Sequence, residues 1–390
     1  MTNPPTFSLI RGEQRIDREA LTAMSDELKE STASGDIVRV DDGSTENVLL
    51  AVLTLDGHCR RVELVPEGVA LDPLVSEPHE LDGPTEWVIY TSGTSGEPKA
   101  VMHTLESLSR AVKPSDGARI WGLVYDPHRL AGLAVVLQAL ATESTLVDVR
   151  AGSITEKVDA MRSAGVTALS ATPTLWRQML QTGRTSGWAL ERITLGGEVS
   201  DQHTLDALAA EFPQARITHI FAASETGVAF AVGDGREGFP HKYLLAPPRG
   251  VALEIRDNIL WVQSPNSSLA GADGFASTDD VVEIVGDRVL FIGRSSGMVN
   301  VGGSKVFPEQ VESIIRKHPS IVDALVFSKR NPFSGNILLA KVIVNTEDPD
   351  IGPADIRRWV ATQVPTHMVP AQVEIVDDLP KSSNGKVVRS

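Results

Sequence analysis

Between residues 104 and 221 the sequence alternates between stretches typical of helices and stretches typical of strands. The helical stretches repeat apolar residues every three or four positions, whereas the strand stretches are short apolar runs bounded by turn residues. Strands joined by helices in this way form parallel pairs, so the pattern predicts a mostly parallel sheet covered by helices. The expected helices span 104–112, 130–140, 155–163, 173–180 and 203–212, and the expected strands span 120–125, 145–149, 166–169, 192–195 and 216–221.

The pattern is different on both sides of this region. Before it, the spacing of apolar residues predicts a helix over 15–30, and a continuous apolar run predicts a buried strand over 48–55. After about residue 247, two hairpins are expected at 251–263 and 281–292, each with a turn built from Asp, Asn or Gly. This region is therefore expected to be rich in antiparallel strands.

From residue 308 a separate α+β pattern begins. Its expected helices span 308–318 and 353–364, and its expected strands span 321–328 and 337–344. We place a domain boundary at 294–297, between a large N-terminal domain over 1–293 and a small C-terminal domain over 298–390. The predicted fold class is α/β, with a mostly parallel sheet and a β-rich subdomain in the large domain, followed by a small mobile α+β domain.

Composition disfavours several classes of partner and excludes others. The 390-residue chain carries a net charge of −15, which disfavours nucleic acid or an anionic membrane as a partner. Its single cysteine, Cys59, excludes an internal disulfide and a cysteine-based metal cluster. The first residues lack the basic and apolar regions of a signal peptide, and no apolar run approaches the length of a membrane span. We therefore expect a soluble cytoplasmic protein, and we leave open whether it forms a homodimer.

A loop rich in glycine and hydroxyl groups is the first candidate for ligand binding. It lies within 90–101, which reads Y-T-S-G-T-S-G-E-P-K-A-V and follows a short apolar strand. Gly93 and Gly96 allow backbone N–H groups to approach a ligand closely, and Lys99 adds a cation. The hydroxyl donors belong to Thr91, Ser92, Thr94 and Ser95. The loop predicts a cradle for a polyanion such as phosphate, and the alternative is an ordinary surface turn.

This loop resembles the phosphate loop of the adenylate-forming superfamily, which includes acyl-CoA synthetases, peptide-synthetase adenylation domains and luciferases. Further stretches resemble the motifs of the family in the same order, from about residue 87 to the last residues. The short segment before the loop is similar to that of short o-succinylbenzoate–CoA ligases. The resemblance implies ATP and Mg²⁺ at the site, with coenzyme A as the expected thiol. It also implies that the loop binds ATP and that Lys99 takes part in catalysis.

Residues 221–227 read F-A-A-S-E-T-G and follow an apolar strand. A hydroxyl next to a carboxylate suits a Mg²⁺–phosphate site, and the alternative is a helix that begins at Ser224 as its cap. The stretch is similar to the Y-G-x-T-E motif of the family. The resemblance implies that Ser224 contacts the phosphate and that Glu225 is the metal ligand. It also assigns Ala222 to the nucleotide site, and Phe221 and Ala223 to the acyl pocket.

Residues 126–132, reading D-P-H-R-L-A-G, close one strand and open a helix. The resemblance places this stretch at the acyl pocket, where it assigns His128, Arg129 and Gly132, together with Gly196 from a later turn. An arginine in such a pocket would be able to grip a second carboxylate on the substrate. The alternatives are a structural histidine and a surface arginine.

Two further stretches resemble nucleotide-binding motifs of the family. Gly197 and Glu198 follow a strand where the backbone of the family passes along the adenine. Residues 277–281, reading S-T-D-D-V, are similar to its T-G-D motif, whose aspartate holds both ribose hydroxyls. We align Asp280 with that aspartate, so that Asp279 replaces the glycine and is the alternative.

The remaining candidates lie near and after the domain boundary. The resemblance implies that Arg294 reaches the ribose or phosphate and that Ser296 belongs to the hinge. It places Gly302 and Gly303 in the loop that forms the thiol tunnel. Lys386 follows a glycine as in the closing P-x-x-x-x-G-K motif of the family, which implies a catalytic contact with the carboxylate and the α-phosphate.

The implied function is ATP-dependent activation of a carboxylic acid through an acyl adenylate, followed by transfer to a thiol. An acid–CoA ligase acting on a small aromatic or dicarboxylic acid fits these motifs first. An adenylation enzyme that loads an acyl-carrier protein or forms an amide is the second hypothesis. A non-enzymatic nucleotide-binding sensor is the third, and the joint presence of Glu225, Asp280 and Lys386 argues against it.

Overall fold

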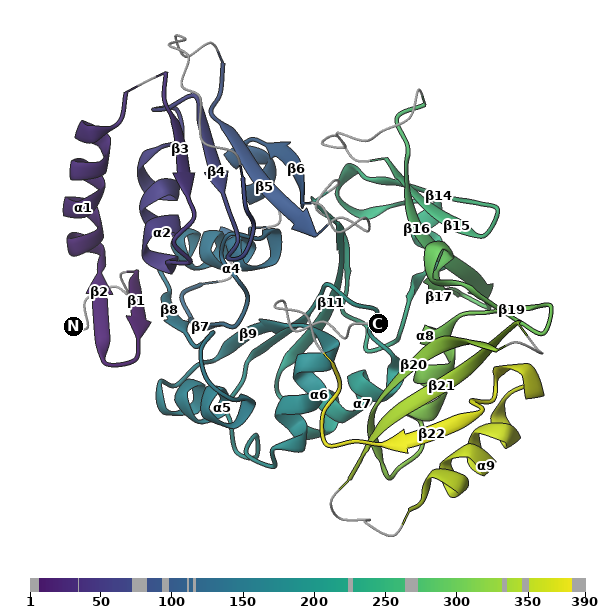
Figure 1. Ribbon diagram of the computed structural model, residues 1–390. Helices are drawn as coiled ribbons and strands as arrows, with labels where there is room; N and C mark the ends of the chain where they lie inside the picture. The colour runs from purple at the N-terminus through teal and green to yellow at the C-terminus, as the bar shows by residue number, and fades with distance from the viewer. Residues whose placement is uncertain are drawn as a thin grey trace.

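The computed structural model describes residues 7–33, 35–71, 83–92, 98–110, 112–114, 117–223, 227–263, 273–331, 335–345 and 351–380. The described strands form four sheets (Figure 1). Among the described helices, none is both long enough and apolar enough to cross a membrane.

The largest sheet has eight strands in the order β12-β11-β10-β9-β7-β8-β1-β2. These strands are β1 (Ser8–Arg11), β2 (Gln14–Asp17), β7 (Ile120–Leu123), β8 (Thr145–Asp148), β9 (Ala168–Ala171), β10 (Arg192–Leu195), β11 (Arg216–Ala223) and β12 (Gly227–Val232). All pairs between β1 and β11 are parallel, and only the edge strands β2 and β12 run antiparallel to their neighbours. The predicted mostly parallel sheet is confirmed.

Helices connect the parallel strands, and three of the four begin at a side-chain cap. They are α4 (Leu130–Ala141), α5 (Ile154–Ser163), α6 (Pro173–Gln181) and α7 (Gln202–Glu211). The side chains of Ser153, Thr172 and Asp201 cap α5, α6 and α7 by accepting a hydrogen bond from a backbone N–H of the first turn. These caps fix the loops that leave the carboxyl ends of the strands, where open α/β sheets bind their ligands.

Helix α4 is apolar on nearly all sides because it packs between two sheets. Its Val136 lies in one core with Leu123 of β7, and its Leu133 lies in another core with Trp87 of β5 (Glu86–Ser92). A helix with apolar contacts on opposite faces needs no polar face, so the pattern of its sequence follows from this position.

The second sheet contains the strand before the glycine-rich loop. Its order is β3-β4-β5-β6, with β3 (Ile37–Val40), β4 (Arg61–Leu64) and β6 (Pro98–His103), and it packs with α1 (Arg18–Ser31), α2 (Thr45–Thr54) and α3 (Leu105–Ser109). Strands β5 and β6 form an antiparallel hairpin in which Thr91 lies opposite Lys99. The buried Cys59 lies in the core of this layer with Trp87. The short apolar strand predicted before the glycine-rich loop is confirmed as β5.

The strand expected over 48–55 is wrong, because these residues form most of helix α2. The hydroxyl of Ser44 accepts a hydrogen bond from the backbone N–H of Asn47 and so caps the helix, and Glu46 lies in its first turn. A continuous apolar run occurs in buried strands and in buried helices alike. The cap signal was therefore the feature that distinguished the two.

A third sheet has the order β13-β17-β16-β15-β14. Its strands are β13 (Phe239–Pro240), β14 (Ala252–Arg256), β15 (Ile259–Gln263), β16 (Ala276–Val285) and β17 (Arg288–Arg294), and the short helices η2 (His241–Leu244) and η3 (Pro248–Gly250) lie before β14. Both predicted hairpins are confirmed. At the first turn Asp257 and Asn258 have φ of 51° and 62°, the left-handed conformation that a tight hairpin turn requires.

The fourth sheet forms the C-terminal part of the chain. Its path is β19-β18-β21-β20, and β22 pairs with β21. Its elements are η4 (Ser295–Gly297), β18 (Val299–Val301), β19 (Ser304–Val306), α8 (Pro308–Ile315), β20 (Ile321–Asn331), β21 (Gly335–Val344), α9 (Pro353–Gln363), η5 (Thr366–Met368) and β22 (Gln372–Ile375). The sheet and its two helices share one core of their own, so the predicted α+β organisation of this part is confirmed.

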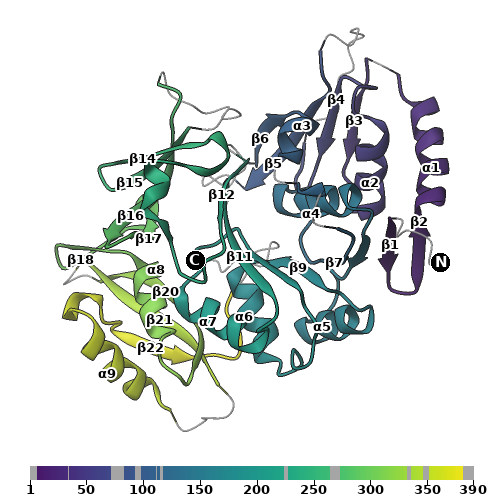
Figure 2. The same ribbon diagram turned by 180° about the vertical axis from the view of Figure 1, so that it is seen from behind.

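The parts are arranged around strand β11. Both views place the four-stranded sheet with its helices on one side of β11, and the sheets of β14–β17 and β18–β22 on the other side (Figures 1 and 2). A group of aromatic rings joins the third sheet to β11 and β12, since Phe221 stacks on Phe230 and on Phe291 with centroids 5.1 Å and 5.3 Å apart. The predicted α/β fold class is confirmed.

Candidate functional site

Several candidate residues lie at the carboxyl ends of neighbouring parallel strands. The hydroxyl of Tyr125, just after β7, donates to the backbone oxygen of Gly196, just after β10, over 3.5 Å. The carboxylate of Glu198 accepts a hydrogen bond from the backbone N–H of Thr174, in the first turn of α6, at 3.1 Å. The turns after β7, β9 and β10 therefore meet, as expected for the ligand-binding edge of such a sheet.

Tyr125 is a hydrogen-bond donor at this edge of the sheet. Burial raises the pKa of its hydroxyl well above the usual range, and the nearby carboxylate of Glu198 raises it further. The phenol therefore stays protonated and acts as a hydrogen-bond donor at any ordinary pH. Gly197 has φ of 81°, a left-handed conformation that lets the turn bend without a side-chain clash.

The turn between β7 and α4 holds a cluster of a carboxylate, an imidazole and a guanidinium. Oδ1 of Asp126 accepts hydrogen bonds from Nδ1 of His128 at 2.9 Å and from its backbone N–H at 3.0 Å. Nε of Arg129 lies 3.6 Å from Oδ2 of the same carboxylate. His128 is fully buried, and Gly132 is needed because a Cβ there would lie 2.1 Å from the backbone oxygen of Asp126. The structure thus brings these acyl-pocket candidates together in one compact turn.

The two charges of this turn influence each other. Burial alone would raise the pKa of Asp126, but hydrogen bonds from the side chain and backbone of His128 hold it below its usual value. Burial lowers the pKa of the Arg129 guanidinium, and the Asp126 carboxylate opposes that shift. The carboxylate is therefore ionised at neutral pH and lies beside a guanidinium.

A second cluster lies where the third sheet ends. Asp280 of β16 lies directly opposite Arg294 of β17, and Nε of Arg294 is 3.5 Å from Oδ1 of Asp280. Burial raises the pKa of Asp280 to about 6, although Arg294 and Thr278 oppose this shift. A buried carboxylate beside an exposed guanidinium suits a ligand with hydroxyl groups and negative charge, such as a nucleotide.

Asp279 serves a different purpose in the same turn. Its φ of 64° is the left-handed conformation that favours glycine, the residue it replaces in the motif. Its carboxylate accepts hydrogen bonds from the backbone N–H of Ser296, at 3.3 Å, and from the Ser296 hydroxyl. Asp279 therefore holds the short helix η4, within the segment where a hinge is predicted, against β16.

Of the remaining described candidates, Phe221 and Ala222 near the end of β11 are half-buried, and the others are exposed. Lys99 is exposed at the start of β6, beside the predicted phosphate loop. Gly302 and Gly303 form the turn between β18 and β19, with φ of 57° and 88°. Figures 1 and 2 both show this hairpin far from β7 and β9, so this arrangement of the chain does not bring the two glycines to the sheet edge.

Some predictions lie outside the described residues. They concern Gly93, Thr94, Ser95, Gly96, Ser224, Glu225 and Lys386, and the side chains of Thr91, Ser92 and Ala223. Within the described ranges, no group of three His, Cys, Asp or Glu residues could hold a metal ion. Mg²⁺ does not require such a group, because one carboxylate with phosphate oxygens and water suffices. The single predicted ligand, Glu225, is therefore chemically adequate.

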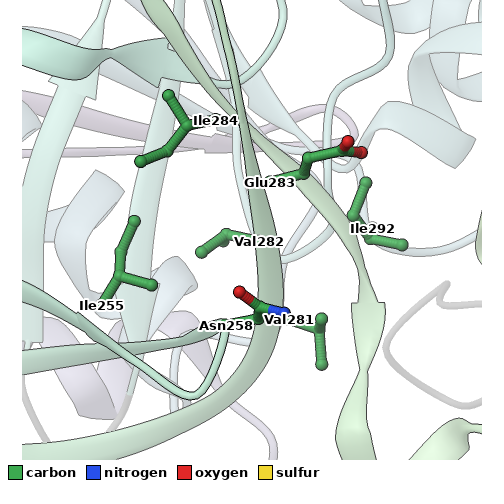
Figure 3. A pocket seen from close by; sticks show the side chains of 7 residues that line it. All are labelled: Ile255, Asn258, Val281, Val282, Glu283, Ile284 and Ile292. Atoms are coloured by element: carbon green, nitrogen blue, oxygen red, sulfur yellow. The ribbon is translucent and has the colours of Figure 1, made fainter.

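A surface hollow of about 460 Å³ lies on the third sheet, next along β16 from Asp280 (Figure 3). Its lining residues are Ile255, Asn258, Val281, Val282, Glu283, Ile284 and Ile292. The lining is mostly apolar and its one charged group is a carboxylate. It therefore lacks the cation that a phosphate ligand would need.

The sequence reasoning missed two members of the site, Tyr125 and Asp126. A local signal existed for Asp126. The side chain of an aspartate in a turn commonly accepts a hydrogen bond from the backbone N–H two positions later, which here is that of His128. Tyr125 carried no comparable local signal, since its partner Gly196 is distant in sequence.

Comparison with known proteins agrees with this geometry. Residues 14–258 match the AMP-binding enzyme family, and residues 310–386 match the AMP-binding enzyme C-terminal domain. The chain is 25% identical over 355 residues to "Surfactin synthase subunit 1" of Bacillus subtilis. This match covers 78% of the present chain but only 10% of the much longer synthase subunit. It is 27% identical over 328 residues to "Probable 2-succinylbenzoate--CoA ligase" of Mycobacterium tuberculosis, with 80% of this chain and 84% of that protein covered.

The fold is also similar to a solved structure. ATP-bound MatB from Rhodopseudomonas palustris has a TM-score of 0.75, with 18% sequence identity, and the match covers 99% of this chain and 95% of that one. A match of nearly the full length in both chains supports one common architecture, including the C-terminal sheet.

Proposed function

Since the chain belongs to the AMP-binding enzyme family, we propose that it is an ATP-dependent acid–thiol ligase that activates a carboxylic acid as an acyl adenylate. The observation that carries this proposal is the match of one chain to both the AMP-binding enzyme family and its C-terminal domain. The clustering of predicted residues at the carboxyl edge of the parallel sheet supports it.

In the proposed first step, a carboxylate oxygen of the substrate attacks the α-phosphorus of ATP, and the bond to pyrophosphate breaks. The substrate carboxylate is already a nucleophile, so the protein has to position it and to stabilise negative charge. We assign these tasks to Lys386, Lys99 and the backbone N–H groups of the glycine-rich loop. Mg²⁺, held by Glu225, would neutralise charge on the phosphates. Asp280 and Arg294 provide the acceptor and cation for the nucleotide.

In the proposed second step, the sulfur of a thiol attacks the acyl carbon, the bond to AMP breaks, and the thiol proton is released. Gly302 and Gly303 would have to come to the site for this step. We therefore propose a large domain over 1–293 and a small domain over 298–390 that rotate about 294–297. Asp279 and Ser296 would hold the hinge in the arrangement described above.

We propose a small aromatic or dicarboxylic acid as the substrate. His128 and Arg129, both in the turn after β7, are the assigned residues of the acyl pocket. Coenzyme A is the proposed thiol. Loading of a carrier-protein thiol is the second candidate, because the exposed Gly302-Gly303 turn leaves room for a tethered thiol as well as a free one.

The first half-reaction is tested by acid-dependent exchange of pyrophosphate into ATP over a panel of carboxylic acids. Exchange with at least one acid, lost in Lys386→Ala, is the expected result. Consumption of coenzyme A in the presence of that acid would identify the acceptor as free coenzyme A, whereas exchange without consumption would favour a carrier protein or an amine. ATP binding without exchange for any acid would contradict the proposal and favour a nucleotide sensor.

A further inference from the structure

The Asp126 carboxylate is the shared partner of both assigned residues in the acyl pocket. One of its oxygens accepts two hydrogen bonds from His128, and the other lies 3.6 Å from Nε of Arg129. The three residues occupy the turn that connects the carboxyl end of β7 to α4. A carboxylate at this position sets both the orientation of the imidazole and the electrostatic state of the guanidinium.

The imidazole of His128 points to a ligand at this turn. Nδ1 donates to Asp126, so Nε2 is the ring nitrogen that remains for another partner. His128 is fully buried, and its Nε2 has no hydrogen-bond partner among the described residues. A buried polar atom without a partner costs free energy, which a bound ligand can offset.

The guanidinium of Arg129 already lies beside an opposite charge of the protein, the carboxylate of Asp126. Its side chain is 19% exposed, and its Nε is buried without a hydrogen bond in the described part of the chain. A second carboxylate from a substrate would approach Arg129 near the ionised Asp126. The two anions would repel each other strongly in a half-buried site, because the effective dielectric constant there is well below that of water.

We propose that Asp126 is a specificity-determining residue whose negative charge offsets the positive charge of Arg129, so that the acyl pocket accepts an aromatic monocarboxylic acid in preference to a dicarboxylic acid. This inference rests on the proposed function and narrows its substrate class. Arg129 then supports the pocket through its paired charge and its aliphatic stem.

A purely structural role for Asp126 makes a different prediction. The backbone of the turn is fixed independently by the close contact between α4 and Asp126 at Gly132. An Asp126→Asn variant keeps an amide oxygen that can accept from His128, but it removes the negative charge beside Arg129. If Asp126 only shapes the turn, this variant should not alter the preference between neutral and charged acyl groups.

The test uses two non-reactive acyl-adenylate analogues with the full-length protein. They are the sulfamoyl adenosines of 4-methylbenzoic acid and of terephthalic acid. The first carries a methyl group at the position where the second carries its free carboxylate. The ratio of their dissociation constants is measured by calorimetry for the wild type, Asp126→Asn and Arg129→Met. Because the adenosine portion is shared, this ratio reports on the acyl pocket alone.

The wild type is expected to bind the methylbenzoyl analogue at least about tenfold more tightly, a difference of about 1.4 kcal/mol. Asp126→Asn should shift the ratio toward the terephthaloyl analogue by about tenfold, because Arg129 becomes available to the second carboxylate. Arg129→Met should not favour the terephthaloyl analogue.

The matched control is Asp148→Asn. Asp148 is also a buried aspartate at the end of a parallel strand, and in the described part of the chain it accepts side-chain hydrogen bonds from Thr45 and from Nε of Arg150, at 2.6 Å and 3.0 Å, which are not candidate residues. An unchanged ratio in Asp126→Asn, or an equal change in Asp148→Asn, would overturn this inference alone. Failure of every variant and of the wild type to bind either analogue would overturn the proposed function, and this inference with it.

Discussion

Nε of Arg316, the residue that follows helix α8 as its C-cap, donates to the carboxylate of Asp201, the cap of α7, over 2.9 Å, and both side chains are at least nine-tenths buried. A second buried ion pair joins Arg177 of α6 to Asp323 of β20 at 3.1 Å. These four charges connect the helices of the eight-stranded sheet to the C-terminal sheet. Burial alone would raise the pKa of Asp201, but Arg316 and Arg177 hold it well below its usual value.

Removal of Arg316 is expected to be costly. In Arg316→Met the carboxylates of Asp201 and Asp323 lose a buried counter-charge, and the free energy of unfolding should fall by about 3–5 kcal/mol. Urea unfolding at neutral pH measures this change. Arg184→Met, which breaks an exposed pair with Asp159, should cost at most about 1 kcal/mol. Equal losses in the two variants would contradict the assigned importance of the buried cluster.

The raised pKa of Asp280 predicts a variant that is more stable than the wild type. The folded-state value of about 6 lies above the usual value of about 3.9, so ionisation of this group reduces stability as pH rises through that interval. Asp280→Asn should therefore raise the free energy of unfolding by about 1–3 kcal/mol at pH 7 and by much less at about pH 4. Denaturant titrations at both pH values give the difference, and a gain independent of pH would count against this explanation.

The same position should matter for the nucleotide. Loss of the charged acceptor in Asp280→Asn is expected to weaken ATP binding by about tenfold or more. Asp279→Gly removes a left-handed aspartate and should leave ATP affinity nearly unchanged. Calorimetric titration with ATP compares the variants. A larger loss in Asp279→Gly would identify Asp279 as the ribose-binding residue instead.

Gly132 is expected to tolerate no side chain. A Cβ there would lie 2.1 Å from the backbone oxygen of Asp126, so Gly132→Ala must displace α4 or the preceding turn and should cost about 1–3 kcal/mol. Gly196→Ala is the control, because a Cβ at Gly196 meets no atom within 4 Å and its stability effect should stay within about 0.5 kcal/mol. Thermal unfolding compares the two, and similar losses would show that packing at Gly132 is not responsible.

The sequence predicted the elements whose signals are local. The alternation of strands and helices, and the Asp257-Asn258 turn, depend on residues close together in the chain, and both are confirmed. The apolar run at 48–55 was misassigned because burial on all sides removes the periodicity that distinguishes a helix from a strand.

Contacts between distant residues carried no such signal. Arg177 and Asp323 are separated by 146 positions, and nothing near either residue indicates the other. The candidate site shows the same division: His128 and Arg129 belong to a recognisable stretch, whereas the link from Tyr125 to Gly196 depends on the assembled sheet. Local sequence therefore located the turns of the site, and only the fold showed how they meet.

The buried Cys59 makes this protein a convenient host for spectroscopic labels. It is the only cysteine of the chain, it is fully buried, and burial raises the pKa of its thiol to about 11, so it should react slowly with maleimides. Cysteines introduced at the exposed positions Gln214 and Lys305 can then carry a donor and an acceptor dye without removal of the native thiol. Energy transfer between these two dyes would follow the C-terminal sheet during turnover, in single molecules and in real time.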